Sequence, residues 1–267
     1  MRPISLEFLT ASEVPSARMI ELAAEHGCSH VGLLVQPMRP FPFFDLLGDT
    51  RARRETRNAL AANGIKLDVT DAFNIQPETD PEIFRPAMES SAYLGADWIN
   101  VLARDPDESR LMDSFGDTCR IAREYGLKVS TEISRRFAHD TLTNTVRFLK
   151  ELGDPEARIT LDSMHFFRHV GTMAEMRAHL DWICRVQLCD GAGDIPPEQQ
   201  LHEARSARLP PGDGIFPLQD FVDVLPPGMV IGVEIPNIHM TLEDRLTRSL
   251  AQTRAMIEKA DRKAGRN

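Results

Sequence analysis

Four polar residues stand at or near the ends of short apolar runs in the second half of the chain: Glu132, Asp162, Gln187 and Glu234. Burying one lone carboxylate costs several kcal/mol, so three carboxylates that converge need a cation among them. Three carboxylates and one amide oxygen form a hard donor set, which suits Mg²⁺ or Mn²⁺, with Co²⁺ as a further option, better than Zn²⁺. The pattern predicts one divalent metal ion bound by these four residues. The alternative is that the carboxylates form salt bridges with arginine or lysine.

The chemistry that such a site supports is proton transfer next to a carbonyl group. A bound cation polarises the carbonyl, which acidifies the neighbouring C–H and stabilises the enediolate that follows. We expect Glu132 or Glu234 to remove the proton, while a second group returns it or helps hydroxide leave. Return of the proton gives an isomerase or epimerase, and loss of a β-hydroxyl gives a dehydratase (lyase). These residues alone separate the two reactions poorly.

Eight short apolar runs in the chain could bring such strand ends together. Their starts lie about 25 to 45 residues apart, which suits a strand, a crossover helix and two loops. No glycine-rich phosphate loop follows the first run, as it would in many open doubly wound sheets. We therefore expect a single (β/α)8 TIM barrel, in which the carboxyl ends of the strands carry the catalytic residues. The runs are Ile4–Leu9, His30–Val35, Lys66–Thr70, Trp98–Leu102, Lys128–Ile133, Arg158–Leu161, Cys184–Cys189 and Met229–Ile235.

Between these runs, apolar residues recur with helical spacing, and a glycine follows several of the predicted helices. No linker rich in proline and serine divides the chain, so we expect one domain over residues 1–267. The longest connection, Asp190–Phe216, should open onto the catalytic face. The predicted helices cover residues 12–26, 50–63, 80–94, 107–125, 140–152 and the stretch from 240 onward, with a charged tail at 259–267 that we expect to fray.

Two further features of the early chain have open interpretations. The segment Gln36–Asp45 combines prolines with aromatic residues. It could form a stiff lid that keeps water from the reaction, or a contact between subunits. Glu7, in the first apolar run, could point into the pocket or pair with a basic residue.

Composition limits the class of protein. The chain has 267 residues, with 31 Lys+Arg against 40 Asp+Glu, and a formal net charge of −9. This balance argues against a nucleic-acid binder, which needs a basic surface. No apolar stretch of about 18 residues and no signal-peptide profile occur, and the four cysteines are scattered. We expect a cytoplasmic protein with reduced thiols that acts on a small molecule, away from membranes, as a homo-oligomer (dimer or tetramer).

The residues at the predicted strand ends carry a resemblance to a known family. The chain resembles the xylose-isomerase-like TIM-barrel superfamily of sugar phosphate isomerases and epimerases, over essentially its whole length. That superfamily also holds ketose 3-epimerases, hydroxypyruvate isomerase, inosose dehydratase, 3-dehydroshikimate dehydratase and endonuclease IV. The motifs concerned are Glu132, Asp162-Ser-Met-His165, Val186-Gln-Leu-Cys-Asp190, Arg208-Leu-Pro-Pro-Gly-Asp-Gly214 and Val233-Glu-Ile-Pro236.

The resemblance implies the same four metal ligands and two substrate-binding residues. His165 matches a family histidine that contacts substrate, although a histidine in the core is the alternative. Arg208 matches a family arginine that reaches over the metal to a substrate oxygen. Arg205 is a competitor one helical turn earlier, and either arginine could instead be a solvated loop charge. Gln187, where many epimerases have histidine, is more similar to hydroxypyruvate isomerase and the dehydroshikimate dehydratases.

Three enzyme classes compete on these residues. An isomerase or epimerase of a keto-sugar or small hydroxy-ketone is favoured, and a metal-dependent dehydratase of the 3-dehydroshikimate or inosose type is second. An endonuclease IV-like enzyme needs extra zinc-binding histidines on early strands. The second, third and fourth runs end in Gln36, Asp71 and Ala103-Arg104, which are not those ligands.

Overall fold

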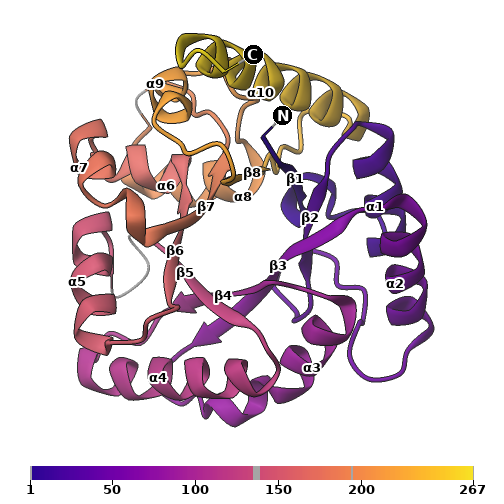
Figure 1. Cartoon of the computed structure of the whole chain (residues 1–267), viewed down its shortest axis with the longest axis vertical. Helices are drawn as coiled ribbons and strands as arrows, with labels where there is room; N and C mark the ends of the chain where they lie inside the picture. Colours follow the sequence, from indigo (N-terminus) through magenta and orange to yellow (C-terminus); the bar gives the residue numbers. More distant parts are fainter. Residues whose placement is uncertain (1, 135–138, 194, 267) are drawn as a thin grey trace.

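Eight parallel strands close into one barrel in the computed structural model, which describes residues 2–134, 139–193 and 195–266 (Figure 1). Each strand pairs with its neighbour in the chain, and the last pairs with the first. The predicted (β/α)8 TIM barrel is confirmed. The strands are β1 (Ile4–Glu7), β2 (His30–Leu34), β3 (Lys66–Ile75), β4 (Trp98–Ala103), β5 (Lys128–Glu132), β6 (Arg158–Asp162), β7 (Ile183–Leu188) and β8 (Val230–Val233).

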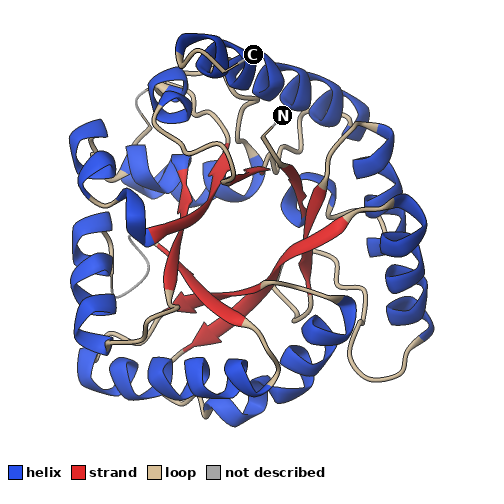
Figure 2. Cartoon of the chain, in the orientation of Figure 1, coloured by secondary structure: helices blue, strands red, loops and turns tan. Residues whose placement is uncertain are grey.

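Helices surround the barrel as an outer layer (Figure 2). The α-helices are α1 (Ser16–Glu25), α2 (Arg51–Asn63), α3 (Arg85–Leu94), α4 (Glu108–Glu124), α5 (Leu142–Leu152), α6 (Ser163–Arg168), α7 (Met173–Ala178), α8 (Gln200–Ser206), α9 (Leu218–Asp223) and α10 (Leu242–Lys263). Short 3₁₀ helices are η1 (Phe8–Ala11), η2 (Pro81–Phe84), η3 (Leu180–Trp182) and η4 (Pro197–Gln199).

The predicted helices are present, with three differences. The helix expected at 80–94 is split into η2 and α3, because Pro86 falls in the first turn of a new helix, where a missing N–H costs nothing. The tail expected to fray remains helical as far as Lys263, since α10 still buries Ile257 and Ala260. The helices α6 to α9, of six or seven residues each, were not predicted, because such short elements show little periodicity.

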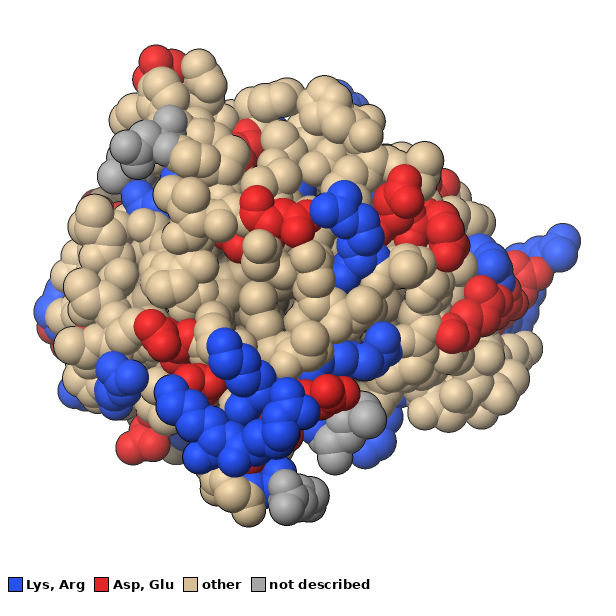
Figure 3. Space-filling view, turned by 90° about the horizontal axis from the view of Figure 1, so that it is seen from above, with Lys and Arg blue, Asp and Glu red and all other residues tan. Residues whose placement is uncertain are grey.

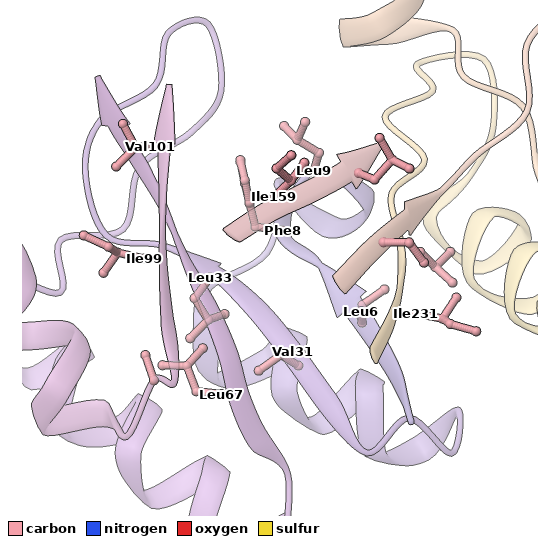
Figure 4. Packing of buried hydrophobic residues seen from close by; sticks show 14 of the residues in the cluster. Leu6, Phe8, Leu9, Val31, Leu33, Leu67, Ile99, Val101, Ile159 and Ile231 are labelled. Atoms are coloured by element: carbon pink, nitrogen blue, oxygen red, sulfur yellow. The ribbon is translucent and has the colours of Figure 1, made fainter. Parts of the chain in front are cut away.

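Apolar and polar residues alternate along the strands, and the alternation separates two environments. Leu6, Ile99 and Ile231 belong to the hydrophobic cluster shown in Figure 4, to which both strands and helices contribute. Successive side chains of a strand point to opposite faces, so the residues next to them face the barrel interior. Those neighbours are Glu7, Asn100 and Gly232. The barrel interior of this protein is therefore polar.

The lower interior holds a buried ion network, here called the floor cluster, which consists of Glu7, Asp68 and Arg185. Arg185 donates from Nη2 to Glu7 Oε1 at 2.5 Å and from Nε to Asp68 Oδ2 at 2.7 Å. All three residues are at most 3% exposed. The Glu7 side chain fits because its neighbours on β2 and β8 are Gly32 and Gly232, where a Cβ atom would lie 2.3 and 2.6 Å from its carboxylate. Glu7 thus pairs with a basic residue beneath the mouth of the barrel.

The outer surface carries charges of both signs. Figure 3 shows one face on which acidic and basic side chains occur near one another, separated by neutral areas. Within the described ranges, no helix has the length and apolar character that crossing a membrane requires. The four cysteines form no disulfide.

Candidate active site

The four predicted metal ligands lie together at the carboxyl-terminal mouth of the barrel. Glu132 and Asp162 end β5 and β6, Gln187 lies one residue before the end of β7, and Glu234 directly follows β8. These four strands are consecutive in the barrel, so their ends converge. Asp162, Gln187 and Glu234 are buried, whereas Glu132 is half-buried. Together with Arg208 these residues are here called the mouth cluster.

Arg208 lies among the carboxylates of the mouth cluster. Its Nη1 is 2.5 Å from Asp162 Oδ2 and 3.0 Å from Glu234 Oε2, and the residue is only 3% exposed. The interpretation of Arg208 as a solvated loop charge is therefore wrong. The salt bridges considered from the sequence do occur for Asp162 and Glu234. One guanidinium against three carboxylates leaves a formal charge of −2 when all are ionised.

The backbone around Arg208 is held on both sides. Its N–H donates to Pro236 O at 3.2 Å, and its carbonyl accepts from Asn237 Nδ2 at 2.9 Å. The next residue, Leu209, exchanges two backbone hydrogen bonds of 2.8 and 2.9 Å with Asp190. These bonds hold the Arg208 backbone on both sides, whereas its side chain extends into the mouth cluster.

The connection Asp190–Phe216 is more ordered than a plain loop, since it contains η4 and α8; its residue 194 lies outside the described residues. The Asp190 carboxylate accepts backbone hydrogen bonds of 2.9 to 3.0 Å from Gly191, Gly212 and Phe216. These three bonds join the start of the connection to residues near its end. The turn after Arg208 is thus tied to the end of β7.

Gln187 supplies a polar atom without a partner. Its Nε2 donates to Glu234 Oε1 at 3.2 Å, while its Oε1 is buried and accepts no hydrogen bond from the described part of the chain. An unsatisfied buried acceptor costs about 1–3 kcal/mol. An amide oxygen in this situation is a suitable ligand for a hard cation.

Asp162 joins the mouth cluster to α6 and to His165. Its Oδ1 accepts from the backbone N–H of Met164 at 2.7 Å and of His165 at 3.3 Å, so Asp162 caps the helix. This short turn places His165 at the cavity wall, half-buried, which does not fit the alternative of a core histidine. Its contact with substrate stays a prediction.

A second buried carboxylate network was not predicted. Asn100 Nδ2 donates to Asp71 Oδ1 at 2.8 Å and to Glu132 Oε1 at 2.5 Å, and Asn100 Oδ1 accepts from Ser130 Oγ at 3.2 Å. This last bond fixes which way the amide points. The signal available in the sequence was one asparagine inside the apolar run Trp98–Leu102. Asp71 was considered only as a missing zinc ligand, yet it lines the cavity.

Burial changes the proton affinity of these carboxyl groups. It raises the pKa of Glu132 to about 8 and the pKa of Asp71 to about 7, with neighbouring carboxylates adding to both shifts. Burial also raises the pKa of Glu234 well above its usual range, although Arg208 opposes the shift. For Asp162, Arg208 and His165 outweigh the effect of burial and lower the pKa. The mouth therefore holds carboxyl groups that can exchange a proton near neutral pH beside one that stays ionised.

Glu132, Glu234 and Asp71 face a cavity that opens to solvent at the mouth. Its polar wall includes Asp71, Glu132, Glu234 and Arg208. The remaining wall combines apolar side chains with other polar groups: Phe8, Leu9, Met38, Phe41, Leu102, Arg104, Ser134, His165, Leu201, Ala204 and Arg205. A concave wall that combines apolar side chains with a few converging polar groups is typical of a small-molecule site.

The segment Gln36–Asp45 contributes Met38 and Phe41 to this wall. Phe41 packs edge-on against Phe8, with ring centroids 6.5 Å apart. Its position over the cavity agrees with the lid interpretation. A role in contacts between subunits stays a prediction.

The donor chemistry of the mouth cluster fits a divalent cation. Its formal charge is −2, all the candidate ligand atoms are oxygens, and Gln187 Oε1 lacks a partner. Among the described residues, no three His, Cys, Asp or Glu side chains are already arranged to hold a metal ion. Arg208 lies between two of the candidate ligands instead. The structure thus brings all six predicted site residues together, while their roles stay predictions.

Comparison with known proteins agrees with this architecture. The sequence profile of the xylose isomerase-like TIM barrel family matches residues 20–259. No curated protein matches the chain in sequence. A solved xylose isomerase-like TIM barrel/4-hydroxyphenylpyruvate dioxygenase fusion protein has a TM-score of 0.80 and 18% identity over 99% of this chain. The chain spans only 44% of the length of that fusion protein.

Three smaller solved proteins match along nearly their whole length. The IolI protein with a bound zinc atom has a TM-score of 0.79 and 16% identity, covering 97% of this chain and 99% of its own. The probable 3-DHS dehydratase AsbF from Bacillus anthracis has a TM-score of 0.75 and 15% identity, and the match covers 96% of this chain and 98% of AsbF. L-Ribulose 3-epimerase has a TM-score of 0.77 and 14% identity, and the match covers 99% of this chain and 97% of the epimerase. At these identities the similarity establishes the fold alone.

Proposed function

Because the chain belongs to the xylose isomerase-like TIM barrel family, we propose that it is a divalent-metal-dependent isomerase or epimerase of a keto-sugar or small hydroxy-ketone. The observation that carries the proposal is the mouth cluster. It gathers three carboxylates and an unpartnered amide oxygen at the catalytic end of the barrel, beside a cavity that opens to solvent. Proteins of this fold include an epimerase, a probable dehydratase and a zinc-bound protein, which supports the same range of chemistry.

Glu132, Asp162, Gln187 and Glu234 would hold the ion, for which Mn²⁺ or Mg²⁺ fits the oxygen donors best. When bound, the ion would polarise a substrate carbonyl as a Lewis acid and favour negative charge on its oxygen. Gln187 would turn its unpartnered Oε1 toward the ion.

The residues of the chain would move the proton. Glu234, whose pKa burial raises, accepts the proton from the carbon next to the carbonyl, and the electron pair of that C–H bond passes to the enediolate. Glu132 faces the same cavity and returns a proton to carbon, which restores the carbonyl. His165 and Arg208 hold substrate oxygens. Phe8 and Phe41 keep bulk water away from the intermediate.

A dehydratase acting on a hydroxy-keto acid is the second candidate, favoured by one observation. Arg104 and Arg205 line the same cavity as Arg208. Guanidinium groups bind carboxylates in bidentate fashion, so an acidic substrate would be held at this wall. A carboxylate of the mouth would then remove the proton next to the carbonyl, and the electron pair of that C–H bond would form the new C=C bond as the C–O bond breaks. A carboxyl group would give its proton to the leaving hydroxyl, which departs as water.

The experiment that tests the proposal is a screen of the purified protein with Mn²⁺, using D-fructose, L-ribulose, an inosose, hydroxypyruvate and 3-dehydroshikimate. Proton NMR in D₂O would follow both products and loss of the C–H signal next to the carbonyl. We expect deuterium incorporation with at least one keto-sugar or hydroxy-ketone, abolished by EDTA. Turnover of 3-dehydroshikimate or inosose with loss of water would favour the dehydratase. Turnover that EDTA leaves unchanged would contradict the proposed metal dependence.

A further inference from the structure

Every carboxylate oxygen of Asp162 and Glu234 already has a partner. Asp162 Oδ1 accepts from two backbone N–H groups, of Met164 and His165, at 2.7 and 3.3 Å. Glu234 Oε1 accepts from Gln187 Nε2 at 3.2 Å. The other oxygen of each residue lies within 3.0 Å of the same atom, Arg208 Nη1. A cation that enters the cluster must therefore replace an existing partner.

The partners differ in how easily they can leave. The N–H groups of Met164 and His165 belong to the first turn of α6 and are fixed by the helix. The amide of Gln187 can turn in place and offer Oε1 instead of Nε2. The Arg208 guanidinium is the one partner that repels an incoming cation, because both are positive and would share the same two carboxylates. Electrostatics thus selects Arg208 as the group that is displaced.

The neighbouring cavity can receive the displaced Arg208 side chain. Its backbone is held by Pro236 and Asn237, whereas its side chain is held, apart from the two carboxylates, by an Nε bond of 2.9 Å to Ala204 O and a contact with Cys189 Sγ. Both Arg208 and Ala204 line the substrate cavity. Rotation of the side chain alone would carry the guanidinium from the cluster into that cavity.

We propose that Arg208 and a divalent cation compete for Asp162 and Glu234, and that the incoming cation moves the Arg208 side chain into the substrate cavity. Arg208 is then a stand-in cation in the metal-free protein and a substrate-binding group in the loaded one. The inference rests on the metal binding of the proposed function. It adds a positioning role: the guanidinium reaches substrate only after the cation has taken its place.

Isothermal titration with Mn²⁺ at pH 8 tests this competition without any substrate. Three proteins are compared: wild type, Arg208→Met, which removes the competing charge, and Arg205→Met, which removes the same charge from the cavity wall. We expect the Kd for Mn²⁺ to fall at least tenfold in Arg208→Met and to change less than twofold in Arg205→Met. Binding by Arg208→Met where wild type shows none would support the proposal equally.

An unchanged or weaker affinity of Arg208→Met, in a protein that unfolds cooperatively, would overturn the competition. If wild type binds Mn²⁺ just as well, the proposed metal-dependent function stands and only the role of Arg208 fails. If neither protein binds Mn²⁺, both fail. A similar gain in Arg205→Met would show a general charge effect and overturn the specific displacement. Should Arg208→Met not fold, the same titration of Arg208→Gln decides between these outcomes.

Discussion

The barrel interior contains two buried clusters of similar composition, and only one of them has the features of a site. The floor cluster and the mouth cluster each place one arginine between two carboxylates, at distances of 2.5 to 3.0 Å. Both also contain polar atoms without a partner among the described residues, such as Glu7 Oε2 below and Gln187 Oε1 above. Burial, pairing and unsatisfied atoms therefore do not separate a structural ion network from a reactive one.

What separates the clusters is access and the balance of charge. The floor arginine, Arg185, belongs to strand β7, and the space around Glu7 is closed by Gly32 and Gly232. The mouth arginine, Arg208, belongs to a connection, and its cluster lines a cavity. A third carboxylate, Glu132, gives the mouth an excess of negative charge. With all groups ionised the formal charge is −1 in the floor cluster and −2 in the mouth cluster, so the mouth has the larger excess of carboxylates and also borders a cavity.

Among the variants that test this comparison, Glu234→Gln should have the largest effect, on kcat/KM. The amide keeps the size of the side chain but cannot accept the proton, and such groups typically contribute about 10²–10⁴-fold to the rate. We expect kcat/KM on a substrate found by the screen to fall by roughly that factor. Activity within about tenfold of wild type would remove Glu234 from proton transfer. Circular dichroism should show that the variant keeps the native fold.

Arg185→Met tests the floor cluster with the opposite expectation. Removing one partner of a buried ion network leaves uncompensated charge on Glu7 and Asp68, which typically costs about 3–5 kcal/mol. We expect the free energy of unfolding in urea to fall by about that amount. The matched control is Arg18→Met, which breaks exposed ion pairs to Glu21 and Glu25 and should lower the free energy of unfolding far less, because solvent screens such pairs. Equal losses in both variants would mean that the floor network does not stabilise the barrel.

The same comparison shows what could be predicted from the sequence. The eight runs follow from periodicity, and each of them overlaps a strand of the barrel. The four candidate ligands follow from polar residues at strand ends; the structure brings their side chains together, and their metal binding stays a prediction. The floor cluster was not, because its members come from β1, β3 and β7, which are distant in the sequence and meet only inside the closed barrel. Glu7 could not be assigned for the same reason.

Asp71 and Asn100 were missed for a related reason. The strand containing Asp71 runs on to Ile75, well beyond the predicted end at Thr70, because its register shifts between Thr70 and Phe73. A register shift depends on the neighbouring strand and leaves no period in the sequence. Arg208, by contrast, could be located through its motif, but only the structure shows that it lies between Asp162 and Glu234.

A more gradual effect is expected from pH in the metal-free protein. The pKa of Glu132 is raised to about 8 in the native state, whereas an unfolded glutamate titrates near pH 4.3. Between these values the native state binds the extra proton, so the free energy of unfolding falls as pH rises, by up to about 1.4 kcal/mol per pH unit for this group. The loss is complete above pH 8. In EDTA, Glu132→Gln should therefore lose stability less steeply than wild type between pH 5 and 8.

Urea unfolding at several pH values measures this difference in slope. Saturating Mn²⁺ should flatten the wild-type profile, because a cation favours the ionised carboxylate. Parallel profiles for wild type and Glu132→Gln in EDTA would show that Glu132 titrates normally. That result would remove Glu132 as a group that exchanges a proton near neutral pH at the mouth.

The smallest effect separates the two arginines at the cavity wall. Arg208→Lys keeps the charge but loses the fork of a guanidinium, which donates two parallel hydrogen bonds to a substrate carboxylate or to neighbouring oxygens. The loss of about one hydrogen bond is worth roughly 1 kcal/mol, so we expect KM to rise about fivefold or kcat to fall by a similar factor. Arg205 lies on α8, is half-exposed and lines the same cavity, and Arg205→Lys should change either parameter less than twofold. Steady-state kinetics with Mn²⁺ measures both. If Arg205→Lys has the larger effect, substrate is held at the outer wall, and Arg208 is a structural cation like Arg185 in the floor cluster.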